Sequence, residues 1–240
     1  MHVISEPNIL YFGTPVVLIG TANPDESFNL APMSSIFWLG WRCVIGLAAA
    51  SQTTQNILRT GECVLNLASA KNVTAVNNLA RTTGSNPVPL GKQQKGYCYE
   101  PGKFERAGLT PLPADIVAAP LVKECDVQLE AKLVHARSLA EEDELMKGRI
   151  ITFELQVVRV HLADSILMDG QANRVDPNKW KPLIMSFKNF TAQVMSCIIP
   201  PWLKYRRSYT KHPTLKEQGK YKFNCRIRLI NFHHAKHFII

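Results

Sequence analysis

The feature that most constrains the fold is a strand that ends in small residues and leads directly into a short capped helix. The apolar run 43–50 ends in Gly-Leu-Ala-Ala-Ala, and a helix over residues 55–60 begins after Ser51-Gln52-Thr53-Thr54 and ends at Gly61. Ser and Thr side chains accept hydrogen bonds from the free amides at a helix start, and Gly readily adopts the left-handed conformation that ends a helix. A strand over residues 63–67 follows, so one short helix joins two strands.

The same segment has the composition of a site for a phosphorylated aromatic ligand. Small side chains at a strand end leave room for a flat ligand to lie against the backbone. Hydroxyl groups at the positive end of a helix favour a phosphate. An ordinary strand, a capped helix and a second strand would show the same pattern, so the ligand interpretation needs a second signal.

That signal is a resemblance to the flavin reductase-like family, carried by four blocks in the family's order and spacing. The blocks are Pro15-Val16-Val17-Leu18-Ile19-Gly20-Thr21-Ala22, Asn29-Leu30-Ala31-Pro32-x-Ser34, Thr53-x-x-Asn56-Ile57 and Gly61-Glu62-Cys63-Val64-Leu65-Asn66. The resemblance implies a mainly β fold, an FMN-binding split β-barrel of Greek-key type with a few short helices. It extends to Phe190, so we expect a flavin reductase-like domain over residues 1–190.

The resemblance also implies which residues bind the cofactor. Those expected near the flavin ring, the ribityl chain and the phosphate are Asn29, Ala31, Pro32, Ser34, Ser35, Ser51, Thr53, Thr54 and Asn56. Many relatives have Lys or Arg immediately before the matching Thr, whereas Gln52 stands here, and charge-assisted bonds to phosphate are lost with that cation. Either another basic residue such as Arg59 substitutes, or FMN is held loosely as a substrate. Lys92, Lys95 and Lys103 could contact a nucleotide phosphate, but solvated surface lysines are the favoured interpretation.

The activity implied by the resemblance is hydride transfer from NAD(P)H to flavin. The flavin carries such chemistry, so no catalytic side chain is expected. The sequence contains no P-loop and no G-x-G-x-x-G motif, so the nicotinamide would bind transiently over the flavin. The family implies a homodimer. The alternative is a non-catalytic split-barrel protein that binds a cofactor or a partner, with a basic tail that contacts nucleic acid.

Composition sets further limits. With 240 residues, 46% of them hydrophobic, the chain suits one large domain. The six cysteines form no C-x-x-C pair and show no metal-ligand spacing, and we expect Cys43, Cys63 and Cys125 to be reduced core residues. The sequence predicts no metal site, no secretory signal and no membrane-spanning run, so a cytoplasmic protein is expected.

The net charge of +9 is confined to the last fifth of the chain. Ten of the 28 basic residues but only one of the 19 acidic residues lie beyond residue 190, which leaves 18 of each before it. Four of the seven histidines lie there too, and clear periodicity ends. We therefore treat residues 191–240 as an atypical basic tail.

Two interpretations of this tail remain open. Degenerate codons for residues 190–210, read one nucleotide out of frame, can spell YGSGHELHHSPLAEIPEELY, which resembles the Gly-rich turn and acidic helix that end many family members. The hypothesis is that the tail is a frameshifted or mis-spliced translation. The competing hypothesis is a nucleic-acid-binding arm, because basic residues alternate there with Trp202, Tyr205, Tyr209 and Tyr221. No nucleic-acid-binding motif supports that arm, so a nucleic-acid partner is not expected.

Overall fold

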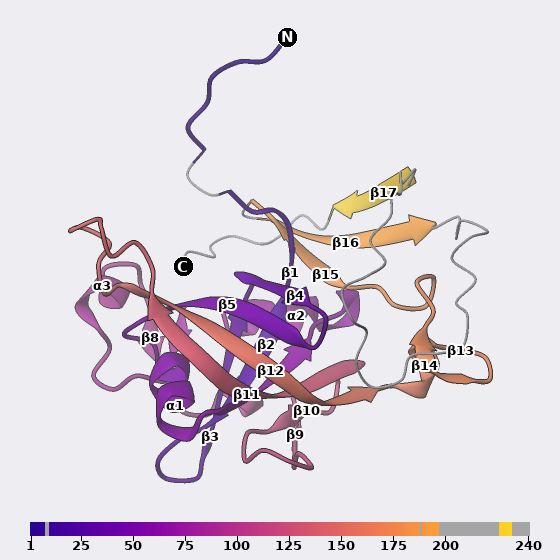
Figure 1. Cartoon of the computed structure of the whole chain (residues 1–240), viewed down its shortest axis with the longest axis horizontal. Helices are drawn as coiled ribbons and strands as arrows, with labels where there is room; N and C mark the ends of the chain where they lie inside the picture. Colours follow the sequence, from indigo (N-terminus) through magenta and orange to yellow (C-terminus); the bar gives the residue numbers. More distant parts are fainter. Residues whose placement is uncertain (8–9, 188, 197–225, 232–240) are drawn as a thin grey trace, which may run out of the picture.

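The computed structural model describes residues 1–7, 10–187, 189–196 and 226–231 (Figure 1). The main sheet of the described chain has seven antiparallel strands in the order β3-β2-β6-β11-β12-β5-β4, and a four-stranded sheet has the order β1-β15-β16-β17. Their strands are β1 (Phe12–Pro15), β2 (Val17–Ala22), β3 (Phe28–Met33), β4 (Ile36–Leu39), β5 (Arg42–Ala48), β6 (Glu62–Leu67), β11 (Val127–Ser138), β12 (Ile150–Leu162), β15 (Leu183–Ser186), β16 (Asn189–Ser196) and β17 (Arg226–Asn231).

Short elements lie between these strands. The helices are α1 (Gln52–Thr60), α2 (Val73–Asn78), α3 (Leu90–Gln93) and α4 (Lys103–Ala107), with 3-10 turns η1 (Ala70–Asn72) and η2 (Asp164–Ile166). Two-stranded pairs are formed by β7 (Thr82–Thr83) with β8 (Cys98–Tyr99), β9 (Pro111–Leu112) with β10 (Leu121–Val122), and β13 (Leu167–Met168) with β14 (Gln171–Val175). None of the helices in the described part of the chain is long and apolar enough to cross a membrane.

The barrel core is built from strands with alternating or continuous apolar residues. Strands β11 and β12 pair along nearly their whole lengths, and Phe153 and Leu155 of β12 are completely buried. Strand β2 is buried on both faces: Ile19 packs in the larger core cluster, and Leu18 packs against helices α2 and α4 in a second cluster. A strand that is apolar on both faces therefore separates the two cores.

Helix α1 forms where the sequence predicts it, although three residues earlier. Ser51 is its N-cap and accepts a hydrogen bond from the Thr54 amide at 3.1 Å. Gly61 ends the helix with φ of 70°. The helix lies against the side of the barrel (Figure 1) and packs on β2, β3, β5, β6 and β11, which fixes its first turn beside the ends of β3 and β5.

The apolar stretch over residues 12–22 forms two strands and not one. Strand β1 pairs with β15, whereas β2 pairs with β3 and β6, and the break falls at Val16. Its amide and carbonyl bond to Leu183 and Ala68, outside both pairings. Most of the predicted tail 191–240 lies outside the described residues; within it, residues 191–196 belong to β16, which pairs with β17.

Candidate functional site

An open cleft lies where β3, β5 and the start of α1 meet the connector that follows α2. One wall consists of the neutral residues Ala31, Pro32, Met33, Ser34, Ala48, Ser51, Gln52 and Thr53. The connector supplies the second wall, with Leu79, Arg81, Thr82, Thr83, Gly84, Lys92, Tyr97 and Lys103. Tyr11, Met185 and Phe187 close an apolar end. The cleft thus joins small neutral groups, cations and aromatic side chains.

Hydroxyl groups at the start of α1 are oriented by hydrogen bonds. Ser51 Oγ donates to Thr54 Oγ1 at 2.9 Å, and Thr54 Oγ1 in turn donates to the Ala48 carbonyl at 2.8 Å. Thr53 Oγ1 accepts from Asn29 Nδ2 at 3.0 Å, so the Thr53 hydroxyl proton is left to donate elsewhere. The first amides of a helix have no partner within it. This end of the cleft therefore offers hydrogen-bond donors and no negative charge.

The sequence predicted nine site residues, and the structure brings five of them to the cleft. These five are Ala31, Pro32, Ser34, Ser51 and Thr53. The other four lie just behind the wall or beside it. They form hydrogen bonds that hold the lining residues in place.

Two of those four are buried asparagines. Asn29 Nδ2 donates to both Thr21 Oγ1 and Thr53 Oγ1, and Asn29 lines a neighbouring cavity rather than the cleft. Asn56 Nδ2 donates to Thr21 Oγ1 at 3.0 Å and to Asn23 Oδ1 at 2.8 Å. Both side chains tie the first hairpin to α1.

The other two are hydroxyl residues. Thr54 is completely buried and belongs to the hydroxyl chain that runs from Ser51 to Ala48. Ser35 Oγ lies 2.5 Å from the phenolic oxygen of Tyr11, so it fixes an aromatic ring that lines the apolar end. Neither of the two lines the cleft among the described residues.

The second wall carries three basic side chains. Lys92 Nζ donates to Thr83 Oγ1 at 3.1 Å and lies 5.6 Å from the centre of the Tyr97 ring. Arg81 has a left-handed backbone with φ of 55°, which is uncommon for a residue with a side chain. Lys103 is only 4% exposed and its side chain lines the cleft, so its ammonium group is largely desolvated but not sealed from solvent.

Burial changes the protonation of this wall. Desolvation, together with the nearby charge of Lys92, lowers the pKa of Lys103 from 10.5 to about 7, although the carboxylate of Glu100 opposes this shift. Desolvation also lowers the pKa of Lys92. Taking an ammonium group out of water without a full counter-charge disfavours its charged form. An anion in the cleft would remove that penalty.

For the connector, the sequence analysis favoured solvated lysines over lysines that contact a phosphate. Lys95 is exposed as expected, but Lys92 is half-buried and Lys103 is buried, so the expectation of solvated lysines is wrong for these two. Arg59 does not line the cleft; its guanidinium donates to a backbone carbonyl of the first hairpin. Arg81 gave no sequence signal. The departure from periodicity after residue 80 is the one available hint, since long irregular connectors often carry function.

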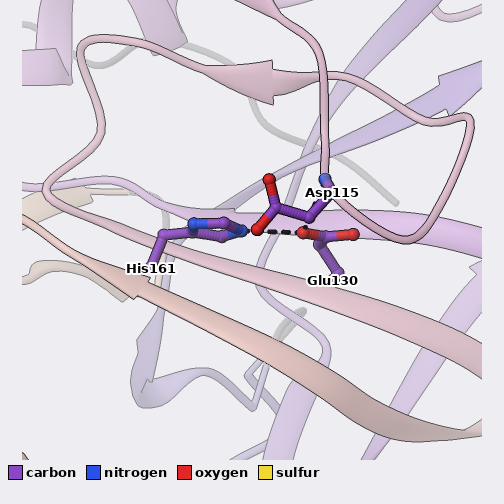
Figure 2. A group of neighbouring side chains, drawn as sticks. All are labelled: Asp115, Glu130 and His161. Carbon is purple, nitrogen blue, oxygen red and sulfur yellow. Dashed lines mark hydrogen bonds and ion pairs between the residues drawn. The ribbon is translucent and has the colours of Figure 1, made fainter.

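A second cluster of titratable side chains lies away from the cleft, on β11 and β12. Figure 2 shows His161 pointing at Glu130, with Asp115 beside them. Glu130 Oε1 accepts from His161 Nε2 at 2.7 Å and from the Asp115 amide at 3.0 Å. Glu130 Oε2 accepts from the amides of Ile116 and Val117 at 2.7 and 3.1 Å.

We interpret this cluster as a structural clamp. Glu130 is completely buried, and each carboxylate oxygen already accepts two hydrogen bonds, so a metal ion would have to displace them. Burial alone would raise the pKa of the Glu130 carboxyl, but the hydrogen bonds from His161 and the three amides together lower it. The clamp holds loop 115–117 against the barrel.

The buried cysteines also have a structural role. Cys43, Cys63 and Cys125 are buried and free, as the sequence predicted. Desolvation raises the pKa of the Cys43 thiol to about 12 and raises those of the other two as well. Thiols with raised pKa values are poor nucleophiles.

Known proteins are similar to this chain in both sequence and fold. The flavin reductase like domain family matches residues 9–192. Protein YdfE of Bacillus subtilis is 35% identical over 185 residues, which cover 77% of this chain and 86% of that protein. The flavoredoxin of Desulfovibrio vulgaris has a TM-score of 0.62 and 24% identity, over 78% of this chain and 88% of its own.

A Shewanella frigidimarina structure with a split barrel domain has a TM-score of 0.55 at 23% identity, over 73% of this chain and 79% of its own. Together with the seven-stranded antiparallel sheet, this likeness confirms the mainly β split-barrel fold expected from the sequence. The family match covers three-quarters of the residues, including both walls of the cleft. The chain therefore belongs to the flavin reductase-like domain family and is a flavin-related oxidoreductase.

Proposed function

We propose that this chain binds FMN in the cleft and catalyses NAD(P)H-dependent flavin reduction. One observation carries the proposal: the largely buried side chain of Lys103, whose pKa is lowered to about 7 chiefly by desolvation, lines a cleft whose other wall offers only neutral hydroxyls and amides. Desolvation of a cation without a full counter-charge costs free energy. An anion bound between Lys103 and the start of α1 would offset that cost, and the phosphate of FMN is such an anion.

The residues of the cleft fit both ends of FMN. The Thr53 hydroxyl and the first amides of α1, which Ser51 caps, would hold the phosphate together with Arg81, Lys92 and Lys103, since hydroxyls, helix amides and cations are all phosphate donors. These three cations would take over the role of the Lys or Arg that many relatives have at the position of Gln52.

The flat ring would lie towards the apolar end. Ala31 and Ala48 project little from the neutral wall, and Tyr11, Met185 and Phe187 provide apolar contacts. Phe187 has a left-handed backbone with φ of 53°. Its ring packs edge-on against the ring of Phe12, with 4.7 Å between the two ring centroids. Strained residues often position groups at binding sites. We infer that Phe187 and Tyr11 limit the access of water to a bound ring.

Bound FMN would supply the hydride chemistry, accepting two electrons from a reduced nicotinamide and passing them to an acceptor. The chain's own residues would bind, orient and shield the reacting groups. This proposal requires no side chain to act as an acid or base, and the sequence analysis likewise expects no catalytic side chain.

The test is an absorption spectrum of the purified full-length protein. Flavin bands that bleach on addition of NADH or NADPH are the expected result. Lys103→Met should lose most of the bound flavin, whereas Lys123→Met, which removes an exposed lysine outside the cleft, should keep it. A colourless protein that does not bind added FMN would instead support the non-catalytic binding or interaction protein.

We also propose a homodimer, on the basis of an apolar sheet edge. Strand β4 is one edge strand of the seven-stranded sheet; Phe37 and Leu39 on it are 53% and 72% exposed, and Trp41 in the turn that follows is 63% exposed. Exposed apolar patches of this kind mark protein interfaces. Light scattering after gel filtration should give twice the chain mass, and Trp41→Glu should reduce it. A wild-type monomer at micromolar concentration would contradict the proposal.

A cytoplasmic location is a further proposal. It is supported by the free thiols of Cys43, Cys63 and Cys125, since reducing compartments keep thiols unpaired. Cell fractionation tests it, and recovery of the protein from an extracellular fraction would contradict it.

For the tail we propose a frameshifted or mis-spliced origin from about residue 191. The family match ends at residue 192, where acidic residues nearly vanish from the sequence. Sequencing of the transcript is the test. A single uninterrupted reading frame through residue 240, identical to the genomic frame, would contradict this origin and leave the basic arm as the alternative.

A further inference from the structure

A second cavity adjoins the cleft at its cationic end. The turn between β2 and β3 and the segment 99–101 form its sides. Gln52 and Gly84 line both the cleft and this cavity, so the two spaces lie on either side of these residues. A ligand held in the cleft by a phosphate could therefore extend into the second cavity past Gln52 and Gly84.

The charge of the second cavity is opposite to that of the cleft. Asp25 and Glu100 are its charged lining residues, and no basic side chain is among the described residues that line it. The hydroxyl and amide of Ser27 hydrogen-bond to Asp25 Oδ1 at 2.6 and 3.2 Å and lower the pKa of the Asp25 carboxyl, so it is ionised at neutral pH. Two carboxylates thus stand beside a cluster of three cations.

Glu100 is held in place from behind. Its Oε1 accepts from the Gly102 amide at 3.0 Å, and its Oε2 lies 3.3 Å from Arg106 Nη1. The Arg106 side chain is half-exposed and does not line the cavity. Arg106 offsets part of the Glu100 charge, so the unpaired Asp25 is the stronger source of negative potential in the cavity.

A buried acceptor between the two spaces lacks a partner. Asn29 is 2% exposed and lines the second cavity, and its Oδ1 accepts no hydrogen bond from the residues that the structure describes. Gly84 lies directly against it: a methyl group on Gly84 would come within 2.6 Å of Asn29 Oδ1. A buried acceptor without a donor costs about 1–3 kcal/mol, which a ligand hydroxyl or N–H group would relieve.

We propose that the second cavity is a nucleoside subsite, which takes an adenosine with unphosphorylated ribose hydroxyls joined through phosphate to the cleft. This assignment rests on the proposed function, because the dinucleotides of that chemistry carry adenosine on a diphosphate. Carboxylates accept hydrogen bonds from ribose hydroxyls, as acidic residues do in dinucleotide sites. The same carboxylates repel a phosphate on the 2′ position.

Aromatic residues complete the subsite. Tyr99 is 44% exposed at the cavity, and Phe28 is half-buried beside it. Bases stack on such rings with little dependence on base identity. The adenosine can come from the flavin, as FAD, or from the electron donor, as NADH. In the second case the subsite disfavours NADPH.

The first experiment measures the binding of two nucleotide fragments to the full-length protein by calorimetry. ADP should bind at least tenfold more tightly than adenosine 2′,5′-bisphosphate. Asp25→Asn with Glu100→Gln should remove most of this preference. Glu105→Gln, which removes a nearby exposed carboxylate outside the cavity, should preserve it. Equal binding of the two fragments, or no ADP binding, would overturn the subsite.

A second experiment identifies the source of the adenosine. If FAD binds at least tenfold more tightly than FMN, and the double variant removes the difference, the adenosine belongs to the flavin. If FAD and FMN bind equally and the double variant removes a KM preference for NADH over NADPH, it belongs to the donor. The absence of both differences would overturn the subsite. A protein that binds ADP but no flavin would instead contradict the proposed function.

Discussion

Lys103 and Glu130 are both buried charged side chains, and they differ in how well their surroundings satisfy them. Glu130 receives four hydrogen bonds, three from consecutive loop amides and one from His161. Lys103 lines an open cleft beside a second lysine, and its ammonium group is largely desolvated. Burial works against both charges, but only Glu130 has its compensation within the chain.

This difference separates a structural charge from a functional one. A buried charge with every hydrogen bond made stabilises its own surroundings, and the pKa of Glu130 is lowered accordingly. A buried charge whose pKa moves towards its neutral form needs a partner from outside the chain. Of the two, only Lys103 therefore supports the proposed binding site.

The largest effect on stability is expected at the clamp. Glu130→Gln places an amide NH₂ against backbone N–H groups and should lower the free energy of unfolding at pH 7 by about 3 kcal/mol. Urea denaturation measures it. The matched variant Glu62→Gln, at a carboxylate that accepts one hydrogen bond from the Ala118 amide and forms an ion pair with Lys132 at 3.6 Å, should cost about 1 kcal/mol. Equal costs for the two variants would break the distinction.

The clamp should also depend on pH in a defined direction. The pKa of Glu130 is lower in the folded protein than in the unfolded chain, so its contribution is present above the ordinary carboxyl pKa of 4.5 and is lost as pH falls below it. The stability difference between wild type and Glu130→Gln should therefore shrink towards acid pH. A difference that stays constant from pH 7 to pH 3 would contradict this account.

Lys103→Met should have opposite effects on binding and stability. FMN affinity should fall 30- to 100-fold, about 2–3 kcal/mol, because a charge-assisted phosphate contact is lost. The free energy of unfolding of the flavin-free protein should rise by about 1–3 kcal/mol at pH 6, because a desolvated positive charge is removed. Flavin titration and urea denaturation measure these effects, with Lys123→Met as the control. If Lys103→Met lowers both the free energy of unfolding and the FMN affinity, Lys103 has a structural role instead.

The pH dependence of Lys103 has the opposite sign from that of Glu130. Its pKa is about 7 in the folded protein and 10.5 in the unfolded chain, so between these values the unfolded chain binds more protons and stability rises with pH. The stabilising effect of Lys103→Met should thus be greatest at pH 6 and nearly absent at pH 10. FMN affinity of the wild type should fall above pH 7, and the variant should lack that fall.

The smallest effect is expected at Gln52. Gln52→Lys adds a cation beside the hydroxyl groups of Ser51 and Thr53, and should raise FMN affinity up to tenfold, or about 1 kcal/mol. A cation at a helix start is unfavourable by about 0.3–1 kcal/mol, so the flavin-free protein should lose that much stability. If Gln52→Lys does not raise FMN affinity, the phosphate does not bind at the start of α1.

Local sequence determined the strand and helix positions around the neutral wall. The Ser51 cap, the Gly61 terminus and the alternating residues of β11 and β12 act within a few residues, so each is visible in the sequence. The resemblance to the family added the barrel and the positions of five lining residues. The other four predicted residues support the wall through side-chain hydrogen bonds, which only the packing decides.

Tertiary structure decided the electrostatics of the site. Lys92 and Lys103 look like ordinary surface lysines in the sequence, and Arg59 looks well placed on α1. The fold directs the exposed end of α1 away from the cleft and returns the irregular connector over the helix start, with Lys103 at the first residue of α4. Burial and charge depend on contacts between segments far apart in the chain. Local pattern determined where strands and caps form, whereas long-range packing determined which charges lose their water.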